Sequence, residues 1–287
     1  MTSFLTPEQV TFYHKEGYLV VPNFWSEQTV ADLKGRMQEI VGGLDFSENP
    51  NGIFTTKEQR RATNDYFLES GHAIRFFWEE KSFDKDGALT RPPGLSINKI
   101  GHGLHDLEPV FEQATYEARV GQICRDLGLS VPLAVQSMYI FKQALVGGEV
   151  NAHQDGAFLY TEPQSVIGFW WALDDCTQAN GCLWAVPGSH SIGVHRRYRR
   201  EDPPSKGTEF VPAAPIDFDL TGAVPLETKK GTLVILHSAL VHYSAENTSA
   251  QCRHAYSVHV VEGGHGVVYP PDNWLQRPAE HPFRVIP

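Results

Sequence analysis

The N-terminal part of the chain carries the apolar spacing of helices. Thr6 can cap a first helix, because a proline follows it directly and a glutamine lies three residues after it. We expect this helix to run to about Glu16 and to stop at Gly17, ahead of a β-rich run at 18–22. Ser26 can cap a second helix that ends at a Gly-Gly pair. Its apolar residues recur with a period of about 3.6: Val30, Leu33, Met37, Ile40 and Val41.

The pattern changes near residue 128. Residues 108–127 still have helical spacing and end near Gly128. Beyond them, short runs rich in Val, Ile, Phe, Trp and Tyr are separated by Gly, Pro, Asn and Asp: 134–143, 165–175, 182–186, 232–237 and 254–261. Many short strands without intervening helices are typical of a sandwich or a jelly-roll barrel. Residues 44–95 are mixed and predict no clear element.

A long connection lies between Arg200 and Lys229. It contains five prolines: Pro203, Pro204, Pro212, Pro215 and Pro225. A long segment without its own secondary structure is either a functional lid or a plain surface excursion between strands. The sequence leaves both interpretations of residues 201–229 open.

Length and composition bound the class of protein. The chain has 287 residues, of which 41% are apolar, so it can bury a sizeable core. We predict one domain over 1–287, because no linker, repeat or low-complexity tract divides it. Its parts would be a helical region at about 1–130, a jelly-roll core at about 131–262 and a tail at 263–287.

Charge and cysteine usage exclude several partners. The formal net charge of −10 leaves no broad basic face for nucleic acid. The four cysteines lie far apart, which argues against a zinc ribbon and a disulfide scaffold. No apolar run approaches the ~20 residues that span a bilayer, and the N-terminus lacks the features of a signal peptide. We therefore expect a cytoplasmic protein that binds no membrane, with its oligomeric state left open.

Candidate metal ligands stand out among the thirteen histidines. In a strand, residues i and i+2 face the same side, so His153 and Asp155 can present a nitrogen and an oxygen to one metal. His242 follows a glycine turn and a β-rich run. His237 precedes it by five residues but lacks the eleven-residue spacing from His242 to Arg253. His14 and Glu16 lie at a helix end, where i and i+2 share no face.

Two histidines and one carboxylate leave coordination positions of a metal open. This donor set is the facial triad of non-haem Fe(II) oxygenases. The open positions must hold a bidentate 2-oxo acid and then O2. The far end of a 2-oxo diacid is a carboxylate, which the planar fork of Arg253 and the hydroxyl of Ser244 suit.

The chain resembles the phytanoyl-CoA dioxygenase family within the 2-oxoglutarate and Fe(II) dependent oxygenases. The resemblance covers nearly the whole chain and rests on segments in order: 65–68, 74–77, 96–101, 136–143, 147–150, 153–155, 158–163, 180–184, 187–190 and 273–276. It implies a mainly β fold with α elements, a cupin-like double-stranded β-helix buttressed by N-terminal helices. It departs from the family at Gly156-Ala157 and at the doubled aromatic Trp170-Trp171, which could reshape the substrate side.

The same resemblance implies roles for particular residues. By family analogy the iron ligands are His153, Asp155 and His242. Arg253 and Ser244 would hold the distal carboxylate of 2-oxoglutarate. The positions that line the co-substrate pocket would be Lys99, Met138 and Trp170.

The family's chemistry sets the expected reaction. O2 and iron oxidise a substrate C–H bond, most often by hydroxylation, while 2-oxoglutarate is decarboxylated to succinate and CO2; ascorbate would be a stimulant. Some relatives desaturate or rearrange the substrate instead, and the sequence leaves that open. Asp155 argues against halogenation, because halogenating relatives carry a small residue at that position.

The sequence also suggests candidates for contact with the substrate. Our candidates for substrate contact are Tyr160, Phe158, Arg75, Phe77, Trp184 and His190. Most of the aromatic residues would be core, with Tyr160 favoured for contact. His190 follows a Pro-Gly-Ser turn and has either a structural role or a substrate contact. The basic run at 195–200 is either a solvated turn or a patch that attracts a small anionic substrate.

Two other classes of function remain. The His/Asp/His set could hold zinc in a hydrolase or isomerase, but such an enzyme would not need Arg253 and Ser244. A sensor could bind iron and 2-oxoglutarate without oxidising a substrate.

Overall fold

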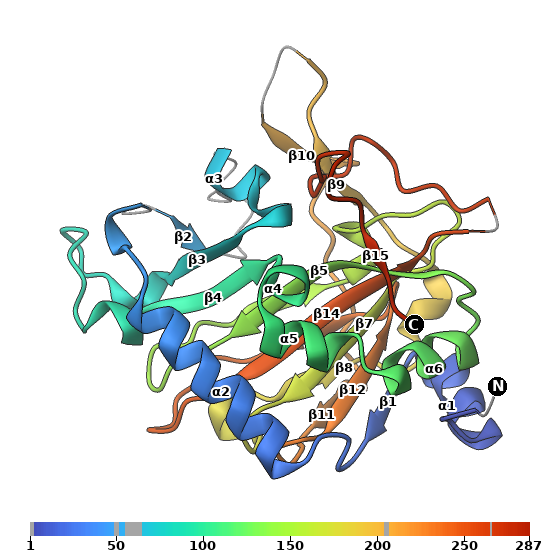
Figure 1. Ribbon diagram of the computed structural model, residues 1–287, viewed down its shortest axis with the longest axis horizontal. Coiled ribbons are helices and arrows are strands. Elements are labelled where there is room, and N and C mark those ends of the chain that lie inside the picture. The colour runs from blue at the N-terminus through green and yellow to red at the C-terminus, as the bar shows by residue number, and fades with distance from the viewer. Residues whose placement is uncertain (1–2, 49–51, 55–64, 204–206, 265) are drawn as a thin grey trace.

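A large β-sheet lies at the centre of the fold (Figure 1). The computed structural model describes residues 3–48, 52–54, 65–203, 207–264 and 266–287. Across these residues the sheet has nine strands, mostly antiparallel, with β15 (Arg284–Val285) paired to β5. Its order is β1 (Tyr18–Val21), β12 (Leu233–His237), β7 (Ile167–Ala172), β14 (Ala255–Glu262), β5 (Pro132–Ile140), β4 (Ile97–His102), β3 (Ile74–Glu79) and β2 (Ile53–Phe54).

A four-stranded sheet packs against one face of the large one. Its order is β11 (Val224–Leu226), β8 (Leu183–Ala185), β13 (His242–Ser244) and β6 (Val150–His153). Apolar residues of both sheets, such as Leu183 and Leu236, share one buried cluster. Two antiparallel sheets that face each other make the predicted jelly-roll core, so the mainly β fold class is confirmed.

Helices cover the other face of the large sheet (Figure 1). They are α1 (Pro7–Glu16), α2 (Glu27–Gly42), α4 (Leu104–Leu107), α5 (Pro109–Thr115) and α6 (Ala118–Asp126). The short helix α3 (Asp65–Leu68) lies apart from this layer, near β3 (Figure 1). The predicted starts of α1 and α2 are confirmed, since Thr6 forms a capping box with Gln9 and Ser26 accepts from the Thr29 amide. Gly17 ends α1 in the left-handed conformation, with φ 83°.

The region 108–127, predicted from its helical spacing, is helical in the structure. The structure has two helices there, because the backbone of Glu117 is extended, with φ −65° and ψ 142°, and interrupts the helical turn. The break lets α5 and α6 bury separate residues, Phe111 on α5 and Val120 with Ile123 on α6, under the same sheet.

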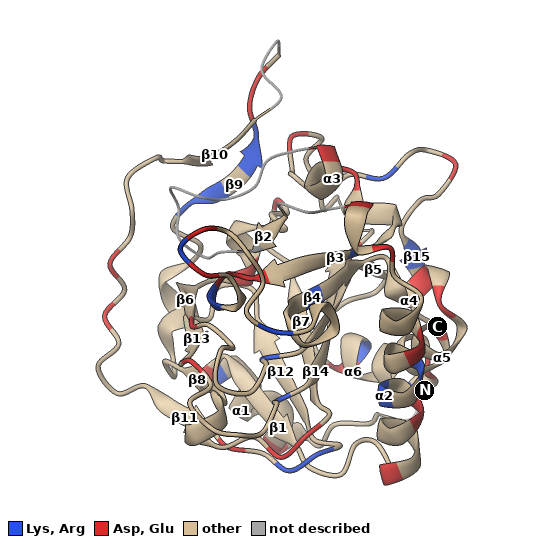
Figure 2. Cartoon of the chain, turned by 90° about the vertical axis from the view of Figure 1, so that its left-hand side faces the viewer, with Lys and Arg blue, Asp and Glu red and all other residues tan. Residues whose placement is uncertain are grey.

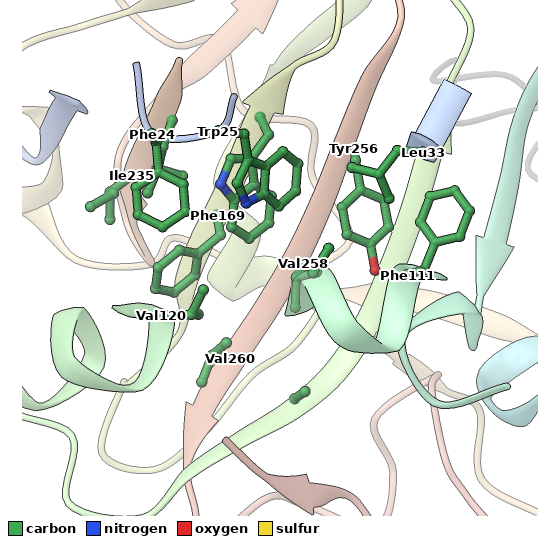
Figure 3. Close-up of a cluster of buried hydrophobic side chains, with 14 of the residues drawn as sticks. Phe24, Trp25, Leu33, Phe111, Val120, Phe169, Ile235, Tyr256, Val258 and Val260 are labelled. Atoms are coloured by element: carbon green, nitrogen blue, oxygen red, sulfur yellow. The ribbon is translucent and has the colours of Figure 1, made fainter. Parts of the chain in front are cut away.

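Buried hydrophobic side chains fill the core between the large sheet and the helices (Figure 3). Successive side chains of a strand point to opposite faces. In β7, Phe169 and Trp171 enter the helix-covered core, while Gly168 and Trp170 line the space between the sheets. Trp171 stacks on Trp25 from the segment before α2, with ring centroids 4.5 Å apart and planes at 10°. The core thus fixes the strand that carries part of the site.

Several strands were not predicted from the sequence. They include β3 and β4 within the region expected to be helical, and a two-stranded ribbon of β9 (Arg197–Arg200) and β10 (Thr208–Val211) that projects from the body (Figure 1). The connection at 201–229 is therefore structured in part, by β10 and β11. Pro204 lies outside the described residues. No described helix has the length and apolar character that crossing a membrane requires.

Candidate metal centre

The two candidate histidines are brought together by strand pairing. His153 ends β6 and His242 begins β13, and the two are directly opposite in the antiparallel register. Asp155 follows two residues later, at the start of a short 3-10 turn. Its Oδ1 lies 3.6 Å from Nε2 of each histidine. Ligand atoms of all three residues lie within 4.8 Å of one another, which is a separation that one metal ion can bridge.

Backbone hydrogen bonds orient both imidazoles. Nδ1 of His153 lies 2.8 Å from the Asn151 carbonyl oxygen, and Nδ1 of His242 lies 3.0 Å from the Leu240 carbonyl oxygen. A carbonyl only accepts, so each Nδ1 donates and each Nε2 keeps its lone pair for a metal. Burial, with nearby His153, lowers the pKa of His242 to about 4. His242 is thus neutral near pH 7, as a metal ligand must be.

Asp155 is buried beside a third histidine. Nε2 of His259, on β14, lies 3.2 Å from Asp155 Oδ2. Burial opposes ionisation of Asp155, but His259 and His242 together outweigh it and hold the pKa of the carboxyl well below its usual value. Gly168 makes room for this carboxylate, because a Cβ there would lie 2.8 Å from Oδ2. The donor set of two neutral imidazole nitrogens and one carboxylate fits a divalent transition metal.

Arg253 is a buried cation without an acidic partner. It lies between β13 and β14, and its side chain faces Trp170, with the guanidinium carbon 5.2 Å from the ring centroid. In the part of the chain that the structure describes, no carboxylate lies within 4.0 Å of it. Its Nε and Nη1 are buried and meet no acceptor. A buried cation of this kind is costly unless an anion joins it, so the site suits an anionic ligand.

A cavity of about 550 Å³ joins the triad to Arg253. The predicted residues that line it are His153, Asp155, His242, Arg253, Ser244, Lys99, Met138, Trp170, Phe158 and Phe77. Lys99 on β4 places Nζ 3.7 Å from the Met138 sulfur and over the Phe77 ring. The structure thus gathers the whole predicted metal and co-substrate set around one space.

Four of the predicted substrate residues do not line this cavity. Tyr160 donates to Glu162 and lies under Arg197, with the guanidinium carbon 4.4 Å from the ring centroid. Arg75 donates to the Tyr66 carbonyl, Trp184 stacks on Tyr243, and His190 lies against His14 and His237. Their contacts are with other parts of the protein, which agrees with the structural role considered for His190 but leaves Tyr160, the residue favoured for substrate contact, outside the cavity.

Most of the basic run at 195–200 lies in β9. Arginines mark this strand in Figure 2. Arg197 pairs with Asp272 at 2.6 Å, and Arg199 pairs with Glu209 at 2.7 Å. These two pairs reduce the positive charge that the run presents. Arg196 differs, because it lines the cavity with its guanidinium carbon 3.7 Å from the Phe210 ring centroid.

Residues from the predicted connection form part of the cavity wall. They are Phe210, Ile216, Asp217, Phe218 and Leu220. Other lining residues that sequence reasoning missed include Gln136, Tyr198 and His259. No local signal in the sequence marked His259, because its position beside Asp155 depends on the pairing of β14 with β7.

Comparison with solved structures shows the fold that this chain shares with other proteins. The fold is similar to the non-heme alpha ketoglutarate dependent carbocyclase SnoK from nogalamycin biosynthesis, with a TM-score of 0.63 and 19% identity over 94% of this chain and 89% of that one. It is also similar to EctD from S. alaskensis with 2-oxoglutarate and 5-hydroxyectoine, with a TM-score of 0.62 and 19% identity over 91% and 77%. Together with the metal centre and the family match that follows, this fold makes the chain a 2-oxoglutarate-dependent oxygenase.

Comparison with known sequences identifies the family. The family model described as phytanoyl-CoA dioxygenase (PhyH) matches residues 13–255. The chain is 46% identical to phytanoyl-CoA dioxygenase of Arabidopsis thaliana over 100% of this chain and 99% of that one. It is 45% identical to phytanoyl-CoA dioxygenase domain-containing protein 1 of Bos taurus over 97% of each. The chain belongs to the phytanoyl-CoA dioxygenase family, as its sequence indicated.

Proposed function

We propose that this oxygenase oxidises a C–H bond of a small organic substrate, by hydroxylation, with decarboxylation of 2-oxoglutarate to succinate and CO2. His153, Asp155 and His242 would hold Fe(II). Bound iron supplies a site where the co-substrate chelates and O2 is activated. The observation that carries the proposal is Arg253, whose buried guanidinium opens on the same cavity as the triad and, among the residues that the structure describes, has no carboxylate within 4.0 Å.

The residues around the iron site have separate tasks in this proposal. Arg253 and Ser244 bind the far carboxylate of 2-oxoglutarate and so orient its keto acid end toward the triad. Trp170 packs on the guanidinium and excludes water from that end of the cavity. Lys99 and Met138 complete the wall on the β4–β5 side.

The composition of the cavity bears on the substrate. Its walls combine aromatic side chains such as Phe77, Phe158 and Tyr198 with few charges. A pocket of about 550 Å³ is in the usual range for small-molecule sites. We therefore propose a compact substrate with an apolar body, and Arg196 would favour one that carries an anionic group.

Asp155 bears on the choice of reaction. Its carboxylate reaches the same point as the two Nε2 atoms, so it occupies the coordination position that a halide would need. This supports oxygenation over halogenation. An intact triad together with a lined substrate cavity also favours an enzyme over a sensor.

An anaerobic titration tests the proposal. Fe(II) and 2-oxoglutarate are added to the metal-free protein, and the weak visible charge-transfer band of the bidentate chelate is followed. O2 is then admitted and succinate is measured with and without candidate substrates. We expect the band, and succinate formation that a true substrate stimulates. Tight zinc binding with no band would instead indicate a zinc hydrolase or isomerase, and a band without stimulated succinate would indicate a sensor.

A further inference from the structure

A buried lysine lies behind the site, and the proposed function gives it no role. Lys142 follows β5 and is 3% exposed. Its Nζ donates to the Ser244 hydroxyl oxygen at 2.7 Å and to the Gly148 carbonyl oxygen at 2.7 Å. Lys142 does not itself line the cavity, whereas Ser244 does. Any effect of Lys142 on a bound ligand therefore passes through Ser244.

The hydrogen-bond chemistry gives this contact a direction. Lys142 Nζ donates in this contact, so the Ser244 oxygen accepts from Lys142. The hydroxyl proton of Ser244 is then left for a different acceptor. Ser244 and Arg253 both open on the cavity, so an incoming carboxylate is well placed to receive that proton.

The surroundings hold Lys142 firmly in this position. Its own carbonyl oxygen accepts from the Arg253 amide at 3.1 Å and from Asn247 Nδ2 at 2.9 Å. Gly181 presses on the side chain, because a Cβ there would lie 2.5 Å from Lys142 Cε. The lysine is thus tied by its backbone to the same loop as Arg253 and packed along its stem.

The electrostatics point to an anion as the missing partner. In the described residues, no carboxylate lies within 4.0 Å of Lys142. Burial lowers the pKa of Lys142 well below its usual value and Arg253 lowers it further, while Glu79 and Glu149 oppose this from farther away. Among the described residues, two buried basic groups thus lie near each other without a contacting carboxylate, which suits a ligand with negative charge at its end.

We propose that Lys142 is a positioning residue for the distal carboxylate of a 2-oxo dicarboxylate: it fixes Ser244 as a donor toward that carboxylate. This inference rests on the proposed function. Without Lys142, the Ser244 oxygen and the Gly148 carbonyl both lose the donor that they share, and the hydroxyl of Ser244 is no longer oriented.

Calorimetry on Mn(II)-loaded protein tests this without turnover. The probes are 2-oxoglutarate and 2-oxobutyrate, which lacks the second carboxylate. Lys142→Met should raise the Kd of 2-oxoglutarate about tenfold or more, as expected for loss of hydrogen bonding to a charged group. The Kd of 2-oxobutyrate should stay within about twofold. Lys229→Met is the matched control, because that lysine is exposed and pairs with Asp175.

A double variant separates action through Ser244 from a general effect. Ser244→Ala should also weaken the binding of 2-oxoglutarate. Adding Lys142→Met to Ser244→Ala should change the Kd much less than Lys142→Met does in the wild-type background. Additive effects, an unchanged Kd in Lys142→Met, or equal losses for both probes would each overturn the inference. Lys142→Gln, which keeps an N–H donor, replaces the Met variant if that one does not fold, with a smaller loss expected. Failure of the wild type to bind 2-oxoglutarate would instead overturn the proposed function.

Discussion

At the scale of single residues, Asp155 has contacts with histidines at both of its carboxylate oxygens. One carboxylate oxygen faces the two imidazole nitrogens, and the other faces His259 across the strand pair β14–β7. His259 and Gly168 occupy paired positions in that register, so the histidine and the space for the carboxylate come from the same point of the sheet. Outer partners of this kind orient metal ligands and tune their affinity.

The first prediction concerns His259. Replacing it with Gln removes the imidazole next to Asp155 Oδ2, so the carboxylate loses its orientation. We expect the affinity for Fe(II) or Mn(II) to fall by about 10- to 100-fold. An anaerobic metal titration measures this, with the surface variant His281→Gln as the control. Unchanged affinity in His259→Gln would show that Asp155 needs no such support.

The second prediction separates the metal from the co-substrate. Asp155→Ala removes a proposed ligand and should abolish iron-dependent succinate formation. Arg253→Ala leaves the triad intact and should mainly raise the concentration of 2-oxoglutarate needed for half-maximal succinate formation. Measuring metal binding in both variants provides the check, since an equal loss of metal affinity in both would contradict these separate roles.

At the scale of elements, strand β7 shows how one short sequence serves the core and the site. Phe169 and Trp171 pack under the helices, and Gly168 and Trp170 face the cavity. Because the side chains alternate, the packing of Trp171 on Trp25 also fixes the height at which Gly168 meets Asp155. The helical layer therefore stabilises the geometry of a metal centre that it does not touch.

The third prediction uses two glycines. In Gly168→Ala the added Cβ would lie 2.8 Å from Asp155 Oδ2, so the carboxylate must move and metal affinity should fall about tenfold or more. In Gly35→Ala, inside α2, the Cβ meets nothing within 4 Å. That variant should raise the free energy of unfolding by about 0.5–1 kcal/mol and leave metal binding unchanged. Urea denaturation and metal titration of both variants decide the matter.

The elements that local pattern could predict are those with local signals. The caps at Thr6 and Ser26 and the apolar spacing after them predicted α1 and α2 closely. Strands β3 and β4 were not predicted, because their partner strands lie far along the chain or in mixed sequence. The spacing of the residues and the resemblance to the family supplied the candidate triad and Arg253. His259 could not be predicted, because it lies beside Asp155 only once β14 pairs with β7.

At the scale of the whole molecule, buried neutral histidines couple the fold to pH. The pKa of His105 is lowered to about 3, first by burial, and that of His254 to about 4 for the same first reason. His105 is held neutral by its contacts, because Arg277 donates to its Nε2 at 2.9 Å while its Nδ1 lies 2.7 Å from the Ser137 hydroxyl. Protonation of Nε2 would remove the acceptor that Arg277 uses.

The fourth prediction follows from the sign of these shifts. Both folded pKa values lie below the unfolded value of about 6.5, so the unfolded state binds more protons between about pH 6.5 and 4. The free energy of unfolding of the metal-free protein should therefore be highest above about pH 6.5 and should fall as the pH drops toward 4. Urea midpoints across that range measure it, and a flat profile would mean that these histidines are not buried in solution.

The origin of the cavity walls has a consequence for how such proteins diversify. The metal and co-substrate side is assembled from strands scattered over both sheets, from β4 to β14. Much of the opposite wall, from Arg196 to Leu220, comes from one continuous stretch of chain. Substitutions confined to that stretch would change this wall and leave the triad and Arg253 in place. The residues that face a substrate there can therefore vary together in evolution without any change in the residues of the metal centre.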